Sequence, residues 1–434
     1  MKPKNTPLRA CGDTARRWPF PLSFKRSRPN DRRDVIVSTT IPLTVLSFCD
    51  ELIAQIQDAG FTPVIVSSPG PELDILARRG LQTEAIPMIR GIAPLADAVA
   101  LVRWFLLMRR RRPHGVLAAT PKAALLATVT ARLTGVPHRS YLFWGLRLET
   151  EPHLRRLALT ASERIVGLSA TTVVANSPSL AEASKELSLF PRSRLHVTDP
   201  GSSHGVDATH FQPRPRDSAL LRALDLNPDT LTIGFVGRLT RDKGVDTLIQ
   251  ALHMLSERNM QWQLIVVSPL EERDAHLYKE DLRSLDGAVI FTGPQSEVRP
   301  YYTLLDLLAL PSRREGFPNV VLEAAAMSIP TITTDATGCK DSVVHMQTGL
   351  RHPVGDPENL AAAIMLLSED GDLRREMGRR ARERAVAEFT PQAIVQQTLN
   401  VSIPCTNAGH QCQYTNRQPL PIKQSRNRSQ NKLG

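Results

Sequence analysis

Two glutamates in one short segment are the residues best placed to do chemistry in this chain. Glu315 precedes the segment Gly316-Phe317-Pro318-Asn319-Val320, and Glu323 lies in the Ala-rich helical run that follows. A strand-like run, Leu304 to Pro311, comes before them, so we expect Glu315 in a strand-to-helix loop and Glu323 about one to two turns into the helix. Open α/β sheets bind ligands at the carboxyl ends of their strands. A diphosphate on this helix N-terminus would leave Glu315 facing a sugar and Glu323 accepting hydrogen bonds from a ribose.

A basic strand-end loop lies upstream of the glutamates. The segment Ile233 to Gly244 reads as an apolar strand that ends in Gly237, with Arg238 and Lys243 in the connection to a helical run. Gly237 would let the backbone approach a phosphate closely. Arg238 would bind the phosphate through two parallel N–H hydrogen bonds, and Lys243 would supply a point charge. A solvated loop with ordinary surface charges is the alternative, and glutamates at this spacing also occur by chance. A basic and an acidic strand-end loop in one α/β half favour a shared site.

Together these segments resemble the nucleotide-sugar domain of the family-4 glycosyltransferases of GT-B architecture. The resemblance covers roughly residues 35–390 and is most specific between residues 233 and 355. It implies two doubly wound Rossmann-like domains that face a central cleft. It also implies transfer of a hexosyl group with retention of configuration from a nucleotide sugar, for which we expect a UDP-sugar. No cofactor and no metal are expected, because two cations and a helix end would offset the charge of the leaving group and no suitable pair of aspartates is evident.

The resemblance also implies roles for single residues. The expected catalytic residues are Glu315, beside the donor sugar, and Arg238 and Lys243, on the donor diphosphate; Glu323 would contact the ribose. A strand end at residues 291–293 matches the one whose backbone reads the base, and the turn after Glu315 matches the one whose amides contact the sugar. The expected donor-binding residues are Gly237, Arg238, Lys243, Phe291, Thr292, Gly293, Glu315, Gly316, Phe317, Pro318, Asn319, Val320 and Glu323.

The chain departs from the family pattern in two respects. Ser268, Ser328 and Met346 stand where family members often have glycine. If those glycines serve a positive φ or a close approach, the replacements cost stability or affinity. The apolar helix that crosses back onto the first domain in this architecture is expected to be missing, because Pro404 would stop a helix begun at residues 395–401.

Length and charge distribution define the expected domains. A chain of 434 residues suits an acceptor-binding domain at 34–200, a linker at 201–212 and a nucleotide-sugar domain at 213–400. The net charge of +11 lies at the ends, since residues 1–33 hold ten Lys or Arg and two Asp, and residues 401–434 hold five Lys or Arg and no acid. Both ends lack apolar periodicity and are predicted to be disordered basic tails. The part between them is nearly neutral, so no specific nucleic-acid partner is expected.

Strands alternate with helices in the first half, which predicts a parallel, doubly wound sheet. Three strand ends, at residues 38–44, 120–122 and 144–149, are candidates for the acceptor site. Arg147 in the last of them would either meet an acceptor diphosphate or pair with a nearby glutamate at the surface.

A local excess of positive charge lies between Leu101 and Ile165, with twelve Lys or Arg against three Glu. The cations at 109–112 follow an apolar run that contains Trp104. This pattern fits a core-packed helix whose terminal cations complement its dipole, and it also fits a surface that meets anionic lipid headgroups. The two interpretations are compatible. The apolar run is too short to span a bilayer.

These observations predict a cytoplasmic transferase, peripheral on the inner face of the plasma membrane, that extends a lipid-diphosphate-linked glycan for capsule, lipopolysaccharide or exopolysaccharide. No secretory signal is evident, and five scattered cysteines suit a reducing compartment. The expected partners are a nucleotide sugar, the lipid-linked acceptor and an anionic membrane. Two alternatives stay open: a soluble transferase acting on a non-lipid acceptor, and a degenerate, non-catalytic GT-B protein.

Overall fold

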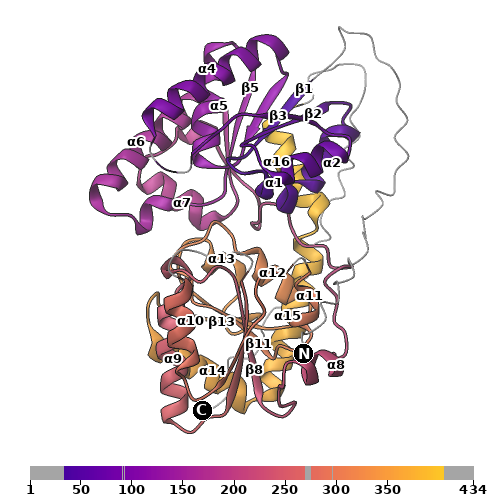
Figure 1. Ribbon diagram of the computed structural model, residues 1–434, viewed down its shortest axis with the longest axis vertical. Helices are drawn as coiled ribbons and strands as arrows, with labels where there is room; N and C mark the ends of the chain where they lie inside the picture. The colour runs from indigo at the N-terminus through magenta and orange to yellow at the C-terminus, as the bar shows by residue number, and fades with distance from the viewer. Residues whose placement is uncertain (1–33, 90, 92, 269–274, 296, 405–434) are drawn as a thin grey trace, which may run out of the picture. The chain divides into compact units, whose positions relative to one another are not determined.

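Two parallel β-sheets with helices packed against them make up the described part of the chain (Figure 1). The structure is a computed structural model that describes residues 34–404 apart from 90, 92, 269–274 and 296. Strands and helices alternate along the chain, as predicted. Strands that are buried on both faces require such covering helices. The tails predicted at 1–33 and beyond 404 lie outside the described residues.

The first sheet has seven parallel strands in the order β3-β2-β1-β4-β5-β6-β7. They are β1 (Asp34–Ser38), β2 (Thr62–Ser67), β3 (Gln82–Ala85), β4 (Gly115–Ala118), β5 (His138–Phe143), β6 (Thr172–Ala175) and β7 (Leu195–Val197). The strand order turns back between β1 and β4, so their carboxyl ends form a topological switch point. The sequence did not predict the edge strands β3 and β7, because they are short and only partly buried.

Helices cover both faces of the first sheet. They are α1 (Pro42–Phe48), α2 (Asp50–Asp58), α3 (Pro71–Arg78), α4 (Pro94–Arg111), α5 (Pro121–Leu133), α6 (His153–Ser169) and α7 (Pro178–Glu186), with short 3-10 turns η1 (Arg147–Thr150) and η2 (Arg192–Arg194). Ile36 faces the core under α4 and α5, whereas Val35 and Val37 face the core under α1 to α3, as the alternation of a strand requires.

Trp104 lies on the side of α4 that packs into the core. It is 0% exposed and is buried together with Leu107 and Met108. Of the two interpretations of this run, the core-packed helix therefore holds for Trp104, which does not belong to a lipid-facing surface. Among the described helices, none is both long and apolar enough to cross a bilayer.

The second sheet has six parallel strands in the order β10-β9-β8-β11-β12-β13. They are β8 (Leu231–Val236), β9 (Trp262–Val267), β10 (Ala288–Phe291), β11 (Leu307–Leu310), β12 (Thr331–Thr334) and β13 (Gly349–His352). Its helices are α8 (Ser218–Ala223), η3 (Arg241–Lys243), α9 (Val245–Glu257), α10 (Ala275–Arg283), α11 (Arg299–Tyr302), α12 (Asn319–Ala326), α13 (Cys339–Ser342), α14 (Pro357–Glu369) and α15 (Gly371–Glu388). Its switch point lies between β8 and β11.

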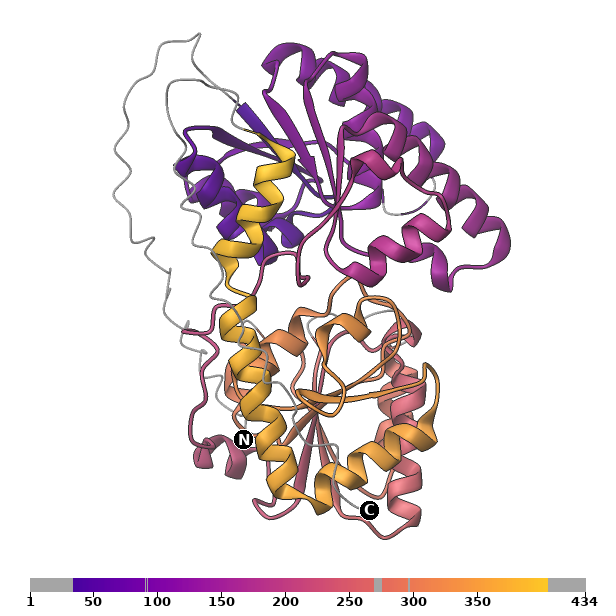
Figure 2. The same ribbon diagram turned by 180° about the vertical axis from the view of Figure 1, so that it is seen from behind.

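A last helix, α16 (Pro391–Ser402), returns to the first sheet (Figure 2). It packs against α2, β5 and β6, and Val395, Leu399 and Ile403 join the core that contains Val35 and Val37. The expectation that this helix is missing was wrong, because Pro404 follows the helix and so does not interrupt it. The ranges 213–400 and 401–434 are corrected accordingly: residues 391–403 pack with the first sheet.

Two of the three residues that stand where family members often have glycine adopt a left-handed conformation. Ser328 has φ 61° and Met346 has φ 62°, a region that favours glycine. Of the two reasons considered for glycine in the family, a positive φ is therefore the one observed at these two positions. Ser268 is not among the described residues with positive φ.

Candidate active site

The switch point of the second sheet brings the two predicted strand-end loops together. β8 and β11 are neighbours in the sheet, and each is followed directly by one of the loops. Gly237 and Arg238 follow β8, whereas Glu315 lies in the loop between β11 and α12. Glu323 lies within α12, as the sequence predicted.

Lys243 and Glu315 form an ion pair at this switch point. Lys243 Nζ lies 2.5 Å from Glu315 Oε1, and Ser312 Oγ donates a second hydrogen bond to the same oxygen at 2.8 Å. The side chains of Lys243 and Glu315 are 18% and 14% exposed. Limited solvent screening makes this pair stronger than one at the surface, and its cation is accessible to a further anion.

Further ion pairs tie the acidic loop to the basic one. Arg313 Nη2 lies 2.7 Å from Asp246 Oδ2, and Arg314 pairs with Asp242. Gly244 has φ 68°, and a Cβ there would lie 1.9 Å from the carbonyl oxygen of Pro311. Glycine at this position therefore allows the two loops to approach closely enough for these pairs to form.

The N-terminus of α12 presents uncapped backbone amides. The preceding residue, Pro318, provides no side-chain cap, and the first turn contains no acidic residue. Asn319 Oδ1 accepts a hydrogen bond from Ser202 Oγ at 3.1 Å, which fixes the start of the helix. Free amide hydrogens and the helix dipole make such an end favourable for an anion.

Glu323 lines a mostly apolar cavity beside α12. The cavity has a volume of about 170 Å³ and is lined by Val236, Gly237, Val267, Gln295, Val298, Val320 and Glu323. Tyr302 Oη donates a hydrogen bond of 2.9 Å to Glu323 Oε2. Burial raises the pKa of Glu323 to about 7, the hydrogen bond from Tyr302 opposes that rise, and nearby Glu297 adds to it.

The predicted base-reading segment follows β10, beside the same cavity. The backbone amide of Thr292 donates to the carbonyl of Val266 at 3.1 Å, and Gly293 has φ 68°. Gln295, which lines the cavity, donates from Nε2 to the Thr292 carbonyl at 2.6 Å. The segment is therefore held in place by β9 and by the cavity wall. The Phe291 ring lies under the Arg283 guanidinium, at 5.2 Å.

Phe317 differs from the other predicted donor-binding residues. Its side chain is 5% exposed and packs against Phe389, with 5.5 Å between ring centroids. The ring anchors the turn from the core side and does not line the cavity that contains Glu323. Any contact of Phe317 with a sugar would therefore come from its backbone.

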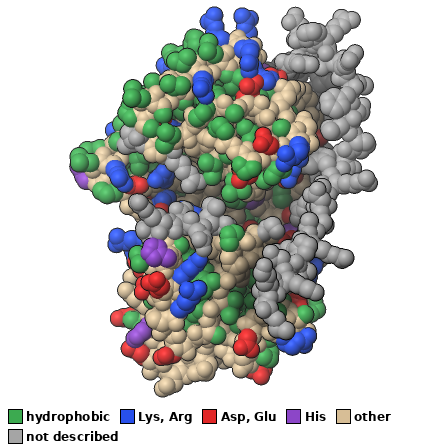
Figure 3. Space-filling model, in the orientation of Figure 1, with side chains coloured by type: hydrophobic (Ala, Val, Ile, Leu, Met, Phe, Trp, Pro, Cys, Tyr) green, Lys and Arg blue, Asp and Glu red, His purple; other side chains and the backbone are tan. Residues whose placement is uncertain are grey.

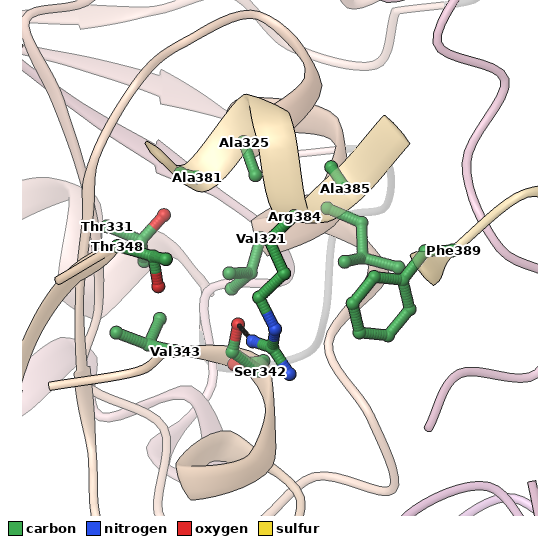
Figure 4. Close-up of a pocket in the computed structure, with 11 residues that line it drawn as sticks. Val321, Ala325, Thr331, Ser342, Val343, Thr348, Ala381, Arg384, Ala385 and Phe389 are labelled. Atoms are coloured by element: carbon green, nitrogen blue, oxygen red, sulfur yellow. Dashed lines mark hydrogen bonds between the residues drawn. The ribbon is translucent and has the colours of Figure 1, made fainter. Parts of the chain in front are cut away.

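A second cavity, between α12, α13 and α15, is a packing gap (Figure 4). Its volume is about 10 Å³, enough for roughly one water molecule. Val321, Ala381 and Phe389 line it, and Arg384 Nη1 donates to the Ser342 carbonyl at 3.0 Å across its edge. It is too small for a sugar or a nucleotide.

Sequence reasoning missed three residues that support the site. Tyr302 binds Glu323, Ser312 binds Glu315, and Gln295 lines the cavity. Ser312 lies next to the charged run Arg313-Arg314-Glu315, which could have drawn attention to it, whereas no local signal marks Tyr302 or Gln295. The described residues contain no cluster of three or more His, Cys, Asp or Glu that could hold a metal ion.

The switch point of the first sheet carries hydroxyl groups, and its cation, Lys122, is paired with Asp97 of α4 at 2.5 Å. Thr40 Oγ1 and Thr120 Oγ1 share a hydrogen bond of 2.7 Å, and the Thr40 amide donates to Thr120 Oγ1 at 2.8 Å. Asn176, at the end of β6, is 4% exposed. Arg147, the charged candidate for this half, pairs with Glu151 at 3.4 Å, which favours the surface ion pair of its two interpretations.

The comparisons with known proteins agree with this architecture. "Glycosyl transferases group 1" matches residues 230–370, and "Glycosyl transferase 4-like domain" matches residues 46–201. The capsular polysaccharide biosynthesis glycosyltransferase CapM of Staphylococcus aureus is 33% identical over 332 residues, covering 76% of this chain and 86% of CapM. The lipopolysaccharide core biosynthesis glycosyltransferase LpsE of Rhizobium meliloti (strain 1021) is 30% identical over 231 residues, covering 53% of this chain and 63% of LpsE. The chain belongs to the group 1, 4-like glycosyltransferases and is a hexosyltransferase.

A solved structure supports the fold. Anabaena Alr3699/HepE in complex with UDP-glucose matches with a TM-score of 0.69 at 19% identity, covering 84% of this chain and 97% of that chain. The two Rossmann-like sheets are those of the GT-B architecture, so the predicted fold class is confirmed.

Proposed function

We propose that this chain transfers a hexosyl group from a UDP-sugar, with retention of configuration, to a lipid-diphosphate-linked glycan during cell-surface polysaccharide synthesis. The observation that carries the proposal is the arrangement at the second switch point. There the Lys243–Glu315 pair, the uncapped start of α12 and the cavity with Glu323 lie at the ends of neighbouring strands. CapM and LpsE act in capsule and lipopolysaccharide synthesis by their names, and HepE binds UDP-glucose, which supports the donor and the pathway.

Each proposed role follows from the chemistry of a group. Lys243, Arg238 and the amides of α12 would hold the donor diphosphate and offset its charge as it leaves. Glu323 would accept hydrogen bonds from the ribose hydroxyls, and the strand end at 291–293 would read the base through its backbone. Glu315 would face the sugar, where positive charge develops in the transition state. These roles require neither a metal nor a cofactor.

The acceptor and the location of the enzyme form the second part of the proposal. A lipid-linked acceptor lies in a bilayer, so the enzyme would work in the cytoplasm, at the inner face of the plasma membrane. The hydroxyl-lined switch point of the first sheet, with Thr40 and Thr120, fits the neutral sugar end of such an acceptor.

Calorimetric titration with UDP, GDP and ADP, with and without EDTA, tests the donor site. We expect UDP to bind in the presence of EDTA and Arg238→Ala to weaken that binding. A matched control is Arg222→Ala, which removes an exposed arginine from α8. Tight binding of GDP or ADP in place of UDP would contradict the donor assignment, and donor binding without transfer would indicate the degenerate, non-catalytic alternative.

A further inference from the structure

Helices α4, α5 and α6 form a layer, here called the α4–α6 layer, that exposes many large apolar side chains. Contacts of α4 and of α6 with α5 hold the layer together on one face of the first sheet (Figure 1). Of the eighteen exposed large hydrophobic residues in the described part of the chain, ten belong to this layer. They are Leu95, Val99, Val102, Phe105, Leu106, Leu133, Leu154, Leu157, Ile165 and Leu168. Hydrophobic side chains gather over this region in the space-filling view, with cations between them (Figure 3).

The exposed residues follow helical spacing on the two outer helices. On α4 they recur at 95, 99, 102 and 106, and on α6 at 154, 157, 165 and 168, so each set forms a stripe along one side of its helix. Leu95 is 87% exposed and Leu154 is 82% exposed. A surface helix normally packs one apolar stripe on the core and turns a polar side outward. α4 and α6 carry apolar side chains on the side that faces the core and also on the outer side, which indicates that a partner covers the outer side.

The charge of the layer defines the chemistry of that partner. Its three helices contain two acidic residues: Asp97 pairs with Lys122 at 2.5 Å, and Glu163 is 5% exposed and accepts a hydrogen bond from Tyr141 Oη at 3.3 Å. The helices contain nine cations, namely Arg103, Arg109, Arg110, Arg111, Lys122, Arg132, Arg155, Arg156 and Arg164. Apolar side chains among arginines, with no exposed acid in these helices, fit an anionic surface.

The arginines of the predicted cluster at 109–112 do not all face outward. Arg110 lies 2.5 Å from Glu84, and Arg111 bridges Glu84 at 2.8 Å and Asp34 at 3.1 Å. Arg109 is exposed, and its guanidinium lies 6.0 Å from the centre of the Phe105 ring. The cluster therefore serves both the fold and the surface.

We propose that the outer face of the α4–α6 layer docks on an anionic lipid bilayer, with its leucines entering the headgroup boundary and its arginines binding lipid phosphates. This inference rests on the proposed function, which places the acceptor in a membrane, and it names the surface involved. A second copy of the chain is a poorer occupant, because two cationic faces would repel each other. A bilayer with anionic headgroups satisfies the apolar and the charged groups together.

Vesicle flotation of the full-length chain tests the proposal, with vesicles of phosphatidylcholine alone or mixed with phosphatidylglycerol. The basic ends of the chain can also attract anionic vesicles, and high salt weakens that attraction. The quadruple variant Leu95→Ser, Leu106→Ser, Leu154→Ser and Leu157→Ser keeps every charge. It should lower binding to mixed vesicles by about tenfold or more, and the difference should persist at high salt. The control Leu277→Ser and Leu366→Ser alters two exposed leucines of the second half and should bind like the wild type.

The outcomes separate this inference from the proposed function. UDP binding and thermal unfolding are measured on the same samples. UDP binding reports on the second half, and an unchanged unfolding transition shows that the first half, which carries the four substitutions, is folded. Loss of flotation with both properties intact supports the docking surface. Equal flotation of wild type and variant, or an equal loss in the control pair, overturns it. The inference also fails if the wild type self-associates through these leucines without floating, while its UDP binding would leave the proposed function standing.

Discussion

The two switch points of this molecule share a topology and differ in charge. In the second sheet the strand ends carry the Lys243–Glu315 pair and, in the adjoining loops, Arg313 with Asp246. In the first sheet the equivalent strand ends carry Thr40 and Thr120, joined by a hydroxyl hydrogen bond, and the nearby cation Lys122 is paired with Asp97 of α4. One arrangement suits a charged diphosphate, which needs cations, and the other suits a neutral sugar, which needs donors and acceptors without charge. The parallel sheet therefore provides the position of a site, and the side chains at the strand ends determine its chemistry.

The largest effect is expected when the negative charge of Glu315 is removed from the second switch point, which tests whether charge there is needed for transfer. Glu315→Gln should lower kcat by about 100-fold or more, because a neutral amide would stabilise a positively charged sugar less and would hold Lys243 less firmly. The measurement is the rate of sugar transfer, with thermal unfolding as the check on the fold. Glu257→Gln changes an exposed glutamate of the same half and should be silent. Wild-type turnover in Glu315→Gln would remove this residue from the active site.

A paired substitution sharpens the difference between the two sheets. Lys243→Ala should weaken UDP binding by about tenfold to thirtyfold, as expected for a charged hydrogen bond to the diphosphate. Thr40→Val should leave UDP binding unchanged and raise the KM for the acceptor, because it removes a hydroxyl from the first switch point. Calorimetry measures the first effect and initial rates the second. If both variants weaken UDP equally, the division between a charged donor site and a neutral acceptor site is wrong.

The pH dependence of donor binding tests whether Glu323 acts as a carboxylate. Its pKa, raised by burial to about 7, means that it loses its proton as pH rises through that value. A ribose diol donates hydrogen bonds, so it binds the ionised form better, and affinity for a UDP-sugar should rise about tenfold between pH 6 and pH 8. A UDP-sugar is the right probe, since its esterified phosphate lacks the ionisation near pH 6 that free UDP shows. Glu323→Gln should flatten the profile, and an unchanged slope in that variant would assign the titration elsewhere.

Tyr302 offers a further check on the same carboxylate. Tyr302→Phe removes the hydrogen bond to Glu323 Oε2, which opposes the rise in the pKa of that group. The midpoint of the pH profile should therefore move upward in this variant, although the phenylalanine ring fills the same space. A midpoint that stays in place would show that the tyrosine does not influence Glu323.

The sequence predicted the charged switch point well because charged residues at strand ends stand out. Lys243 and Glu315 follow apolar strands and precede apolar helices, so their position could be inferred from periodicity alone. The strand ends at 38–44 and 120–122 were also predicted, but Thr40 and Thr120 could not be singled out within them, since threonines are common in loops. Tyr302 was missed for a different reason: its contact with Glu323 joins α11 to α12, which are 16 residues apart in the chain, and it depends on tertiary packing.

The errors in the fold prediction also have physical causes. The helix α16 was missed because Pro404 was read as an interruption, although it lies beyond the last turn. The sequence left open whether Trp104 faces the core or a lipid surface, because both sides of α4 are apolar and periodicity cannot then tell which side faces the core. The outward side of α4 became evident from its packing on α5, which places Trp104 inside and Leu95 outside.

The smallest expected effect comes from a variant that changes the stability of the second half and leaves the charges of its switch point unchanged. Ser328 holds φ 61°, and its carbonyl lies 2.0 Å from where a Cβ on Gly378 would be, so α15 fixes this turn in place. Ser328→Gly should raise the free energy of unfolding by about 0.5–1 kcal/mol. The left-handed conformation strains the folded protein when the residue is serine, and glycine relieves that strain. This gain should exceed the extra backbone entropy that glycine loses on folding. Denaturant unfolding measures the change. The control Ser368→Gly, within α14, should lower stability by a similar amount. Both variants should keep wild-type affinity for UDP; a change in affinity that follows stability would mean that the effects at Glu315 and Lys243 report folding as well as charge.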